Sequence, residues 1–262
     1  MGKTIVPVRR GATGVSMVIF ALLAISCANG PAASGTDTPR ATATARASGS
    51  ATASPSPTAT PAPASVRYVA IGASDTVGVG ATDPAKGSWP ALIASRLPTG
   101  STYVNLGVSG SLALQAVGQQ LPGAIAQRPT VVSLWLAVND LNATIQPSSY
   151  RDALAQIVDG LVQRTTATVF VGNVPDLRAV PVYASIDKNA LLAQIRAYND
   201  VVTAMAAKDP ARVVPVDLFT GSAALVSTAT VSQDGFHPSD EGYQLIADRF
   251  ATAMRARGVP LR

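Results

Sequence analysis

The chain has 262 residues and a formal net charge of +5 at pH 7, a length that suits one domain of ordinary size or two small ones. Most of the positive charge lies in the first 65 residues, which carry +4 and leave +1 for the rest. Basic and acidic residues are interspersed along that remainder, so its composition does not indicate nucleic-acid binding. A single cysteine and a single histidine exclude an intramolecular disulfide, a thiolate metal cluster and a two-histidine metal site. We expect neither a metal nor another cofactor.

Residues 1–27 have the pattern of a secretory signal peptide. Lys3, Arg9 and Arg10 precede a short apolar run at residues 15–25, which is too short to span a bilayer comfortably. The sequence Leu-Ala-Ile-Ser-Cys, which ends at Cys27, resembles the lipobox of bacterial lipoproteins. This resemblance implies that Cys27 is lipidated after cleavage and anchors the protein to the cell membrane, outside the cytoplasm. The alternative is cleavage by the ordinary signal peptidase and full secretion.

Residues 28–65 have the composition of a disordered linker. They contain Ala, Ser, Thr, Pro and Gly with few other residues, and no Val, Leu, Ile, Met, Phe, Tyr or Trp. Such a stretch cannot bury enough apolar area to offset the entropy of ordering it. The linker would tether a single folded domain at residues 66–262.

Within residues 66–262, short apolar runs alternate with stretches of helical periodicity. The predicted strands are residues 66–71, 102–106, 130–136, 167–171 and 213–216. The predicted helices are residues 89–96, 112–120, 150–164, 187–208 and 240–257. Apolar strands that alternate with helices predict a three-layer α/β/α sandwich, with a central, mostly parallel five-stranded sheet. Ligand sites in such folds lie at the carboxyl ends of the strands.

Residues with catalytic potential follow several of these strands. Ser74 lies on a tight turn after the first strand, Gly107 follows the second and Asn139 the third, while Asp234 and His237 lie in the loop before the last helix. In this order, these segments resemble the sequence blocks of the SGNH (GDSL-type) hydrolase superfamily of serine esterases and lipases. The resemblance extends over about residues 67–247. It implies the SGNH form of the α/β/α fold, which is flavodoxin-like, and hydrolysis of esters.

The residue types fit nucleophilic catalysis. A serine hydroxyl needs a neighbouring base, and imidazole has a suitable pKa at neutral pH. His237 is the only histidine, and Asp234, three residues earlier on a glycine-containing turn, can accept its Nδ1 proton. These residues predict a catalytic triad of Ser74, His237 and Asp234. The resemblance further implies an oxyanion hole formed by the backbone N–H groups of Ser74 and Gly107 and by the side-chain amide of Asn139.

The first block departs from the usual Gly-Asp-Ser-Leu of the superfamily. Ala73 precedes the nucleophile and Asp75 follows it. We expect Asp75 to cap the next helix. The alternative is that Asp75 lines the site and disfavours anionic substrates.

The sequence therefore predicts a secreted or surface-anchored serine hydrolase that cleaves carboxylic esters through an acyl-enzyme on Ser74, similar to esterases and lysophospholipases. One alternative is a carbohydrate O-acetylesterase that acts on glycans. An alternative of another class is a non-catalytic surface binding module. We expect a monomer whose substrate is a small ester, an acyl lipid or an acetylated glycan, with membrane contact through the N-terminal lipid and no nucleic-acid partner.

Overall fold

A computed structural model of the chain describes residues 64–262. The predicted signal peptide, the lipidation site at Cys27 and nearly all of the predicted linker lie outside the described residues. None of the described helices is long and apolar enough to cross a membrane.

Five strands form one sheet in which every adjacent pair is parallel. In chain order the strands are β1 (Arg67–Gly72), β2 (Thr102–Asn105), β3 (Val131–Trp135), β4 (Thr168–Gly172) and β5 (Val213–Val216). Their spatial order is β2-β1-β3-β4-β5, so the central strands are fully covered and β2 is a half-exposed edge. Since all strands run the same way, they end together at one side of the sheet, the carboxyl edge, and begin together at the opposite side, the amino edge.

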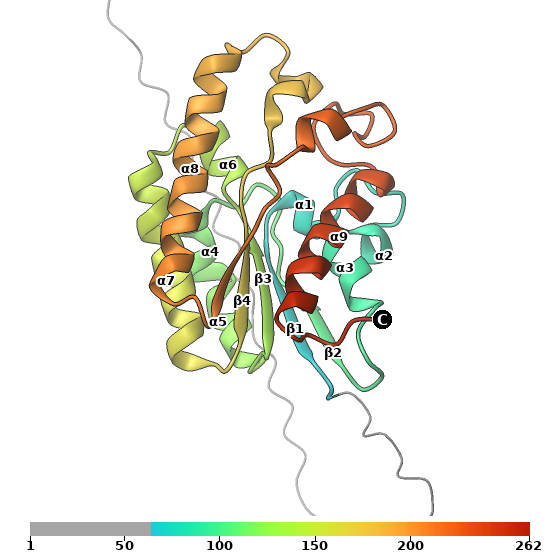
Figure 1. Cartoon of the computed structure of the whole chain (residues 1–262), viewed down its shortest axis with the longest axis vertical. Coiled ribbons are helices and arrows are strands. Elements are labelled where there is room, and N and C mark those ends of the chain that lie inside the picture. The colour runs from blue at the N-terminus through green and yellow to red at the C-terminus, as the bar shows by residue number, and fades with distance from the viewer. Residues whose placement is uncertain (1–63) are drawn as a thin grey trace, which may run out of the picture. The chain divides into compact units, whose positions relative to one another are not determined.

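Helices cover both faces of the sheet, as Figure 1 shows. One face packs against α1 (Ser74–Val77), α2 (Pro84–Gly87), α3 (Trp89–Ala94) and α9 (Asp240–Ala256). The other packs against α4 (Ala113–Gln119), α5 (Leu121–Ala126), α7 (Pro147–Arg164) and α8 (Lys188–Lys208), with α6 (Val138–Asn142) against α8. Three short 3-10 helices, η1 (Leu177–Ala179), η2 (Pro181–Tyr183) and η3 (Ser222–Leu225), lie in the loops that follow β4 and β5. The predicted three-layer sandwich is confirmed.

Aromatic and aliphatic side chains pack the helices of each layer against one another. On one face, Trp89 of α3 is fully buried and stacks on Phe250 of α9, with ring centroids 4.3 Å apart. On the other, α8 buries an apolar stripe that includes Leu191, Ile195 and Met205, and its Tyr198 packs against Tyr150 of α7 with ring centroids 5.0 Å apart. Burial of such large side chains is the main favourable contribution to folding. Trp89 therefore belongs to the core.

The longer elements agree with the predicted ones to within a few residues, whereas α2, α5 and α6 were not predicted. These helices have four to six residues, which is too few to show a helical repeat in the sequence. Local features start two of them: Pro84 begins α2 after Asp83, whose side chain accepts from the Ala85 N–H at 3.1 Å, and α5 has a proline in its first turn. A proline suits this position because the first N–H groups of a helix have no partner in the helix.

Candidate active site

Ser74 is presented by a tight turn between β1 and α1. A Cβ atom at Gly72, the last residue of β1, would lie 1.9 Å from Thr76 Oγ1 and 2.7 Å from the Trp135 carbonyl oxygen. Only glycine therefore allows the chain to turn this closely against β3. The turn brings the largely buried Ser74 side chain to the carboxyl edge of the sheet.

The loop before α9 folds around the carboxylate of Asp234. Gly235 has φ +71°, in the left-handed region that glycine adopts without strain. Asp234 Oδ1 accepts hydrogen bonds from Ser232 Oγ at 2.8 Å, from the Phe236 N–H at 2.8 Å and from the His237 N–H at 2.9 Å. Asp234 Oδ2 lies 2.6 Å from His237 Nδ1. The loop thus fixes both the carboxylate and the imidazole.

The three residues of the predicted triad lie in one hydrogen-bonded row. His237 Nε2 is 3.0 Å from Ser74 Oγ, across 163 positions of the sequence. Partial burial raises the pKa of Asp234, but the hydrogen bonds from His237, the Phe236 N–H and Ser232 outweigh it and hold this pKa well below its usual value. An ionised carboxylate only accepts, so His237 Nδ1 carries the ring proton and Nε2 is free to accept one from Ser74.

The predicted oxyanion donors all follow strands at the carboxyl edge, after β1, β2 and β3. The Ser74 N–H lies in the first turn of α1, where a backbone N–H has no partner within the helix. The Gly107 N–H donates to Asn105 Oδ1 at 2.9 Å, and Asn139 Nδ2 donates to the Ser111 carbonyl oxygen at 3.2 Å. A substrate oxyanion would have to share these two donors with their present acceptors or displace those acceptors. The roles of Gly107 and Asn139 therefore stay predictions.

Asn139 follows a strained residue. Ala137 has φ +23°, which is uncommon for a residue with a Cβ atom, and the Val138 N–H donates to the Leu136 carbonyl oxygen across it. Such strain persists only where the surrounding structure enforces it, and it concentrates at functional sites. Here it turns the chain sharply at the end of β3 and directs Asn139 to the carboxyl edge.

Gln120 joins the nucleophile turn to the loop that follows β2. Its side chain is buried, and its Oε1 accepts from the Gly72 N–H at 2.9 Å. Its Nε2 donates to the Gly72 carbonyl oxygen and to Ser111 Oγ, each at 3.0 Å. Because Ser111 also accepts from Asn139, one buried network holds the turn that carries Ser74 and the predicted oxyanion donor. The sequence showed only a glutamine at a helix end, which gives no sign of this role.

We expect Asn139→Ala to lower kcat by roughly a hundred- to a thousand-fold, the usual effect of losing one oxyanion donor. The fold should remain intact, because Asn139 makes one long hydrogen bond to the Ser111 carbonyl oxygen. Steady-state kinetics with a p-nitrophenyl ester, together with a melting curve, test this. The matched control is Asn189→Ala, on the exposed start of α8, which should change neither quantity. Full activity of the Asn139 variant would remove that residue from the site.

Asp75 does not cap a following helix, so that prediction is wrong. It lies in the first turn of α1, and the cap of α2 is Asp83, which lies beyond a turn through Gly78 and Gly80. Asp75 is half-buried and lines a pocket beside the triad. Burial raises the pKa of Asp75 to about 6, although the nearby His237 lowers it. The alternative, in which Asp75 lines the site, fits this position.

We expect Asp75→Asn to stabilise the protein at pH 8 more than at pH 4. A carboxyl whose pKa is raised in the folded state favours folding while it is protonated, and this contribution is lost as the pH rises from its ordinary pKa through about 6. Asparagine does not ionise, so the variant does not lose this stability as the pH rises. Melting temperatures at the two pH values measure the effect, and Asp152→Asn, an exposed carboxylate on α7, is the control. An equal shift at both pH values would contradict the prediction.

The pocket lies next to the triad and has a volume of about 120 Å³. Asp75, the neighbour of Ser74, and Phe236 and Pro238, the neighbours of His237, contribute to its wall. Most of the remaining wall is apolar, and includes Trp135, Val138, Leu177, Leu218, Val226 and Ile246. The pocket therefore suits an apolar group.

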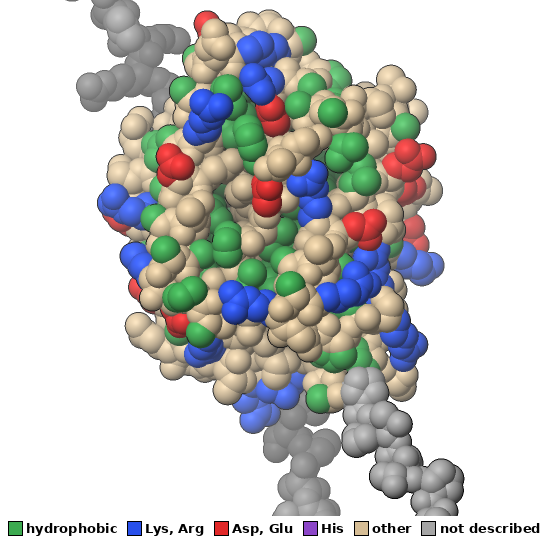
Figure 2. All heavy atoms as spheres, viewed as in Figure 1, with side chains coloured by type: hydrophobic (Ala, Val, Ile, Leu, Met, Phe, Trp, Pro, Cys, Tyr) green, Lys and Arg blue, Asp and Glu red, His purple; other side chains and the backbone are tan. Residues whose placement is uncertain are grey.

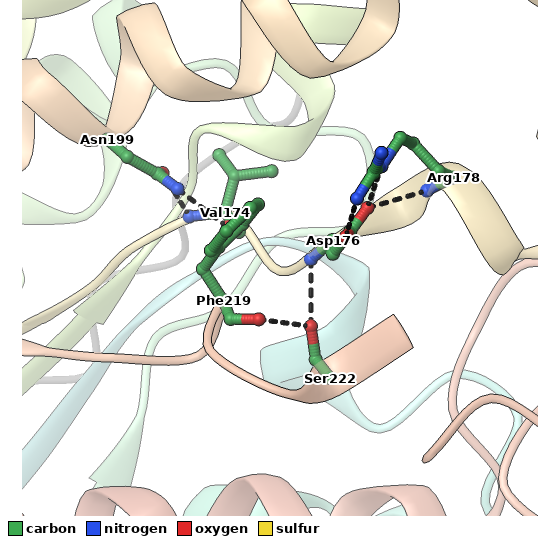
Figure 3. Close-up of polar contacts among 6 residues, drawn as sticks. All are labelled: Val174, Asp176, Arg178, Asn199, Phe219 and Ser222. Atoms are coloured by element: carbon green, nitrogen blue, oxygen red, sulfur yellow. Dashed lines mark hydrogen bonds and ion pairs between the residues drawn. The ribbon is translucent and has the colours of Figure 1, made fainter. Parts of the chain in front are cut away.

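Polar contacts fix one wall of this pocket, as Figure 3 shows. Asn199 of α8 bonds both backbone groups of Val174, with Asn199 Oδ1 accepting at 2.8 Å and Nδ2 donating at 3.0 Å. Ser222 Oγ accepts from the Asp176 N–H at 2.8 Å, and two guanidinium nitrogens of Arg178 bind the Asp176 carboxylate at 2.8 and 2.7 Å. This pairing with Arg178 lowers the pKa of Asp176. The loop after β4 is thus held in place, and its carboxylate is neutralised by a bidentate partner.

Sequence comparison gives one family. A model of the GDSL-like Lipase/Acylhydrolase family matches residues 70–245, more than half of the chain. No curated protein sequence matches the chain significantly.

Solved structures with this fold include several hydrolases. TesA has a TM-score of 0.58 at 21% identity, over 73% of this chain and 99% of TesA. A family 3 carbohydrate esterase from Clostridium thermocellum has a TM-score of 0.55 at 18% identity, over 74% of this chain and 96% of that one. A catalytic mutant of Axe2, an acetylxylan esterase from Geobacillus stearothermophilus, has a TM-score of 0.59 at 18% identity, over 72% of this chain and 94% of that one. At these identities the likeness shows a shared fold, whereas the family model covers both the nucleophile turn and the loop of His237. The protein belongs to the GDSL-like lipase and acylhydrolase family and is a serine ester hydrolase.

Proposed function

We propose that the enzyme hydrolyses carboxylic esters with an apolar acyl group, in the manner of an esterase or lysophospholipase. The observation that carries the proposal is the apolar pocket whose wall includes Asp75, Phe236 and Pro238, the sequence neighbours of Ser74 and His237. Burying one methylene group contributes about 0.8 kcal/mol, so such a pocket favours substrates whose acyl chain reaches into it. A glycan would instead need several polar groups to bind its hydroxyls.

In the proposed mechanism, His237 Nε2 takes the proton of Ser74 Oγ as this oxygen attacks the ester carbonyl carbon. Negative charge develops on the carbonyl oxygen, and the predicted donors Ser74, Gly107 and Asn139 would stabilise it. The ester C–O bond then breaks, and the alcohol leaves with the proton from His237, which produces the acyl-enzyme. Water, activated by the same imidazole, releases the acid and restores Ser74. Asp234 stays ionised throughout and stabilises the imidazolium.

A profile of acyl-chain length tests this substrate class. We expect kcat/KM for p-nitrophenyl esters to rise by roughly fourfold per added methylene until the pocket is full. Val226→Trp, which fills the pocket, should lower kcat/KM for the longer esters by about tenfold and leave p-nitrophenyl acetate nearly unchanged. The matched control is Val182→Trp, which adds the same bulk at an exposed position outside the pocket wall.

A second candidate is an O-acetylesterase acting on glycans. The fold shared with the carbohydrate esterase and the acetylxylan esterase favours it. Activity confined to acetyl esters, with release of acetate from acetylated xylan, would select this candidate over the acyl-chain substrate.

We also propose that the enzyme acts outside the cytoplasm, tethered to the cell membrane through a lipidated Cys27. The proposal rests on the basic start of the chain, the apolar run and the sequence that ends at Cys27. Mass spectrometry of the protein purified from membranes tests it. An N-terminal peptide that begins at Cys27 and carries acyl chains would support the anchor, and an unmodified Cys27 would contradict it.

A further inference from the structure

The fold separates charges that the sequence intersperses. Residues 66–262 contain fifteen basic and fourteen acidic side chains. The segments at the amino edge of the sheet, residues 64–67, 95–101, 127–130, 164–167, 208–212 and 255–262, contain nine of the basic side chains and a single acidic one, Asp209. The rest of the domain, which includes the carboxyl edge, has six basic and thirteen acidic side chains. The amino edge is therefore strongly positive, whereas the rest of the domain taken together is negative.

Seven of the nine basic side chains at this edge are exposed. They are Arg67, Arg128, Arg164, Lys208, Arg255, Arg257 and Arg262. We call them the basic edge. Of the other two, Arg96 pairs with Asp248 at 2.7 Å, and Arg212 is only half-exposed and donates to backbone carbonyl oxygens that include those of Val162 and Ala167.

The charges of the basic edge are held in place without being neutralised. None of the seven side chains forms an ion pair within residues 64–262. Several bind neutral oxygens instead: Arg67 donates to the Arg128 carbonyl at 2.5 Å, Arg257 to the Pro210 carbonyl at 2.7 Å and Arg262 to Thr99 Oγ1 at 2.8 Å. The positive potential thus remains available to an external partner.

Helix ends explain only part of this charge. α3, α5, α7, α8 and α9 all end at the amino edge, and a basic residue at a helix C-terminus is favourable because that end carries roughly half a negative charge. Together these five helix ends offset less than half of the seven charges. Arg67 lies on β1, where no helix ends, and Arg128 follows the last residue of α5 by two positions. Figure 2 shows Lys and Arg side chains predominating along the lower part of the face in view, where the strands begin.

We propose that the basic edge binds the anionic headgroups of a phospholipid bilayer and orients the active site away from it. Lipid is favoured over other polyanions because the described chain enters the domain at this edge, at residues 64–66 directly before β1. The segment proposed to carry the lipidated Cys27 therefore reaches the domain on its positive side. Each basic residue near an anionic membrane surface strengthens binding by about fivefold. The inference does not depend on which ester is the substrate.

The test measures binding of the full chain to two kinds of vesicle by co-sedimentation. One kind is phosphatidylcholine alone, and the other contains about 30% phosphatidylglycerol, close to the charge of anionic bilayers. The apolar N-terminal run can insert into both, so the informative quantity is the ratio of the two partition coefficients. We expect a large ratio at low salt. The ratio should fall steeply at 0.5 M NaCl, because the Debye length is then only about 4 Å and the charges are screened.

Two triple variants of equal charge change locate the surface. Arg128→Gln, Arg164→Gln and Lys208→Gln together should lower the ratio by about a hundredfold. Lys86→Gln, Arg151→Gln and Arg196→Gln, three exposed positions away from the amino edge, should lower it only a few fold. Hydrolysis of a soluble ester should stay unchanged in both, which confirms that they are folded.

Three outcomes would overturn the proposal. Equal losses in the two triple variants would mean that net charge alone drives binding, and a ratio near one for the wild type would mean that there is no anionic-lipid surface. Tighter binding to soluble polyglycerol phosphate or to DNA than to vesicles, at equal phosphate concentration, would assign the basic edge to a polymer instead.

Discussion

Ser74→Ala is expected to lower kcat for ester hydrolysis by roughly 10⁴-fold or more, with no loss of thermal stability. Ser74 Oγ lies 3.0 Å from His237 Nε2, and without this hydroxyl the acyl-enzyme cannot form. Stability should be kept because the turn depends on Gly72 and its bonds to Gln120. Steady-state kinetics and a melting curve measure both parts of the prediction.

A fluorophosphonate probe separates an enzyme mechanism from mere binding of an ester. The probe should label the wild type and fail to label Ser74→Ala. The control is Ser109→Ala, an exposed serine in the loop after β2, which should be labelled at the wild-type rate. Labelling of the Ser74 variant would place the nucleophile elsewhere, and absence of labelling in every form would favour a non-catalytic binding module.

Asp234→Asn is expected to lower kcat by roughly 10⁴-fold through the tautomer of His237. Asparagine can keep Oδ1 as the acceptor for the Phe236 and His237 N–H groups, which leaves its NH₂ group facing His237 Nδ1. The ring proton then moves to Nε2, where it blocks acceptance of the Ser74 proton. The loop should remain folded while the base is lost.

The matched control for this variant is Asp240→Asn. Asp240 is an exposed aspartate at the start of α9 that binds Thr82, and its loss should change kcat only a few fold. Because the pKa of Asp234 is held well below its usual value, the wild-type carboxylate stays ionised in mildly acidic buffer. Loss of wild-type activity between pH 7 and pH 5 should therefore not come from Asp234. Near-wild-type kcat of Asp234→Asn would contradict the proposed role.

The sequence predicted the sheet and the row of candidate residues because both depend on local patterns. Five short apolar runs mark the five strands, and one histidine leaves one possible imidazole. Gln120 and Asp75 could not be assigned in this way. The contacts of Gln120 are with Gly72, 48 positions away, and the side chain of Asp75 faces a wall built by residues from β3 to α9. Both depend on tertiary packing that no local pattern reports.

The basic edge could not be predicted from the sequence, for a similar reason. Basic and acidic residues that are interspersed along a chain give little net charge over the domain as a whole, and only the parallel topology gathers the strand starts and helix ends on one side. Arg128, Arg164 and Lys208 lie far apart in the sequence and belong to three different connections. The topology was predictable, but the distribution of charge over the surface is known only once the positions of the connecting segments are known.

The proposed triad is completed late in synthesis. Ser74 belongs to the first strand-to-helix turn of the domain, whereas Asp234 and His237 precede the final helix, α9. A ribosome that has made the first four strands has therefore made a nucleophile without its base. The row can form only once the last segment has emerged and packed beside β4 and β5, so an incomplete or unfolded polypeptide in transit should be unable to hydrolyse esters.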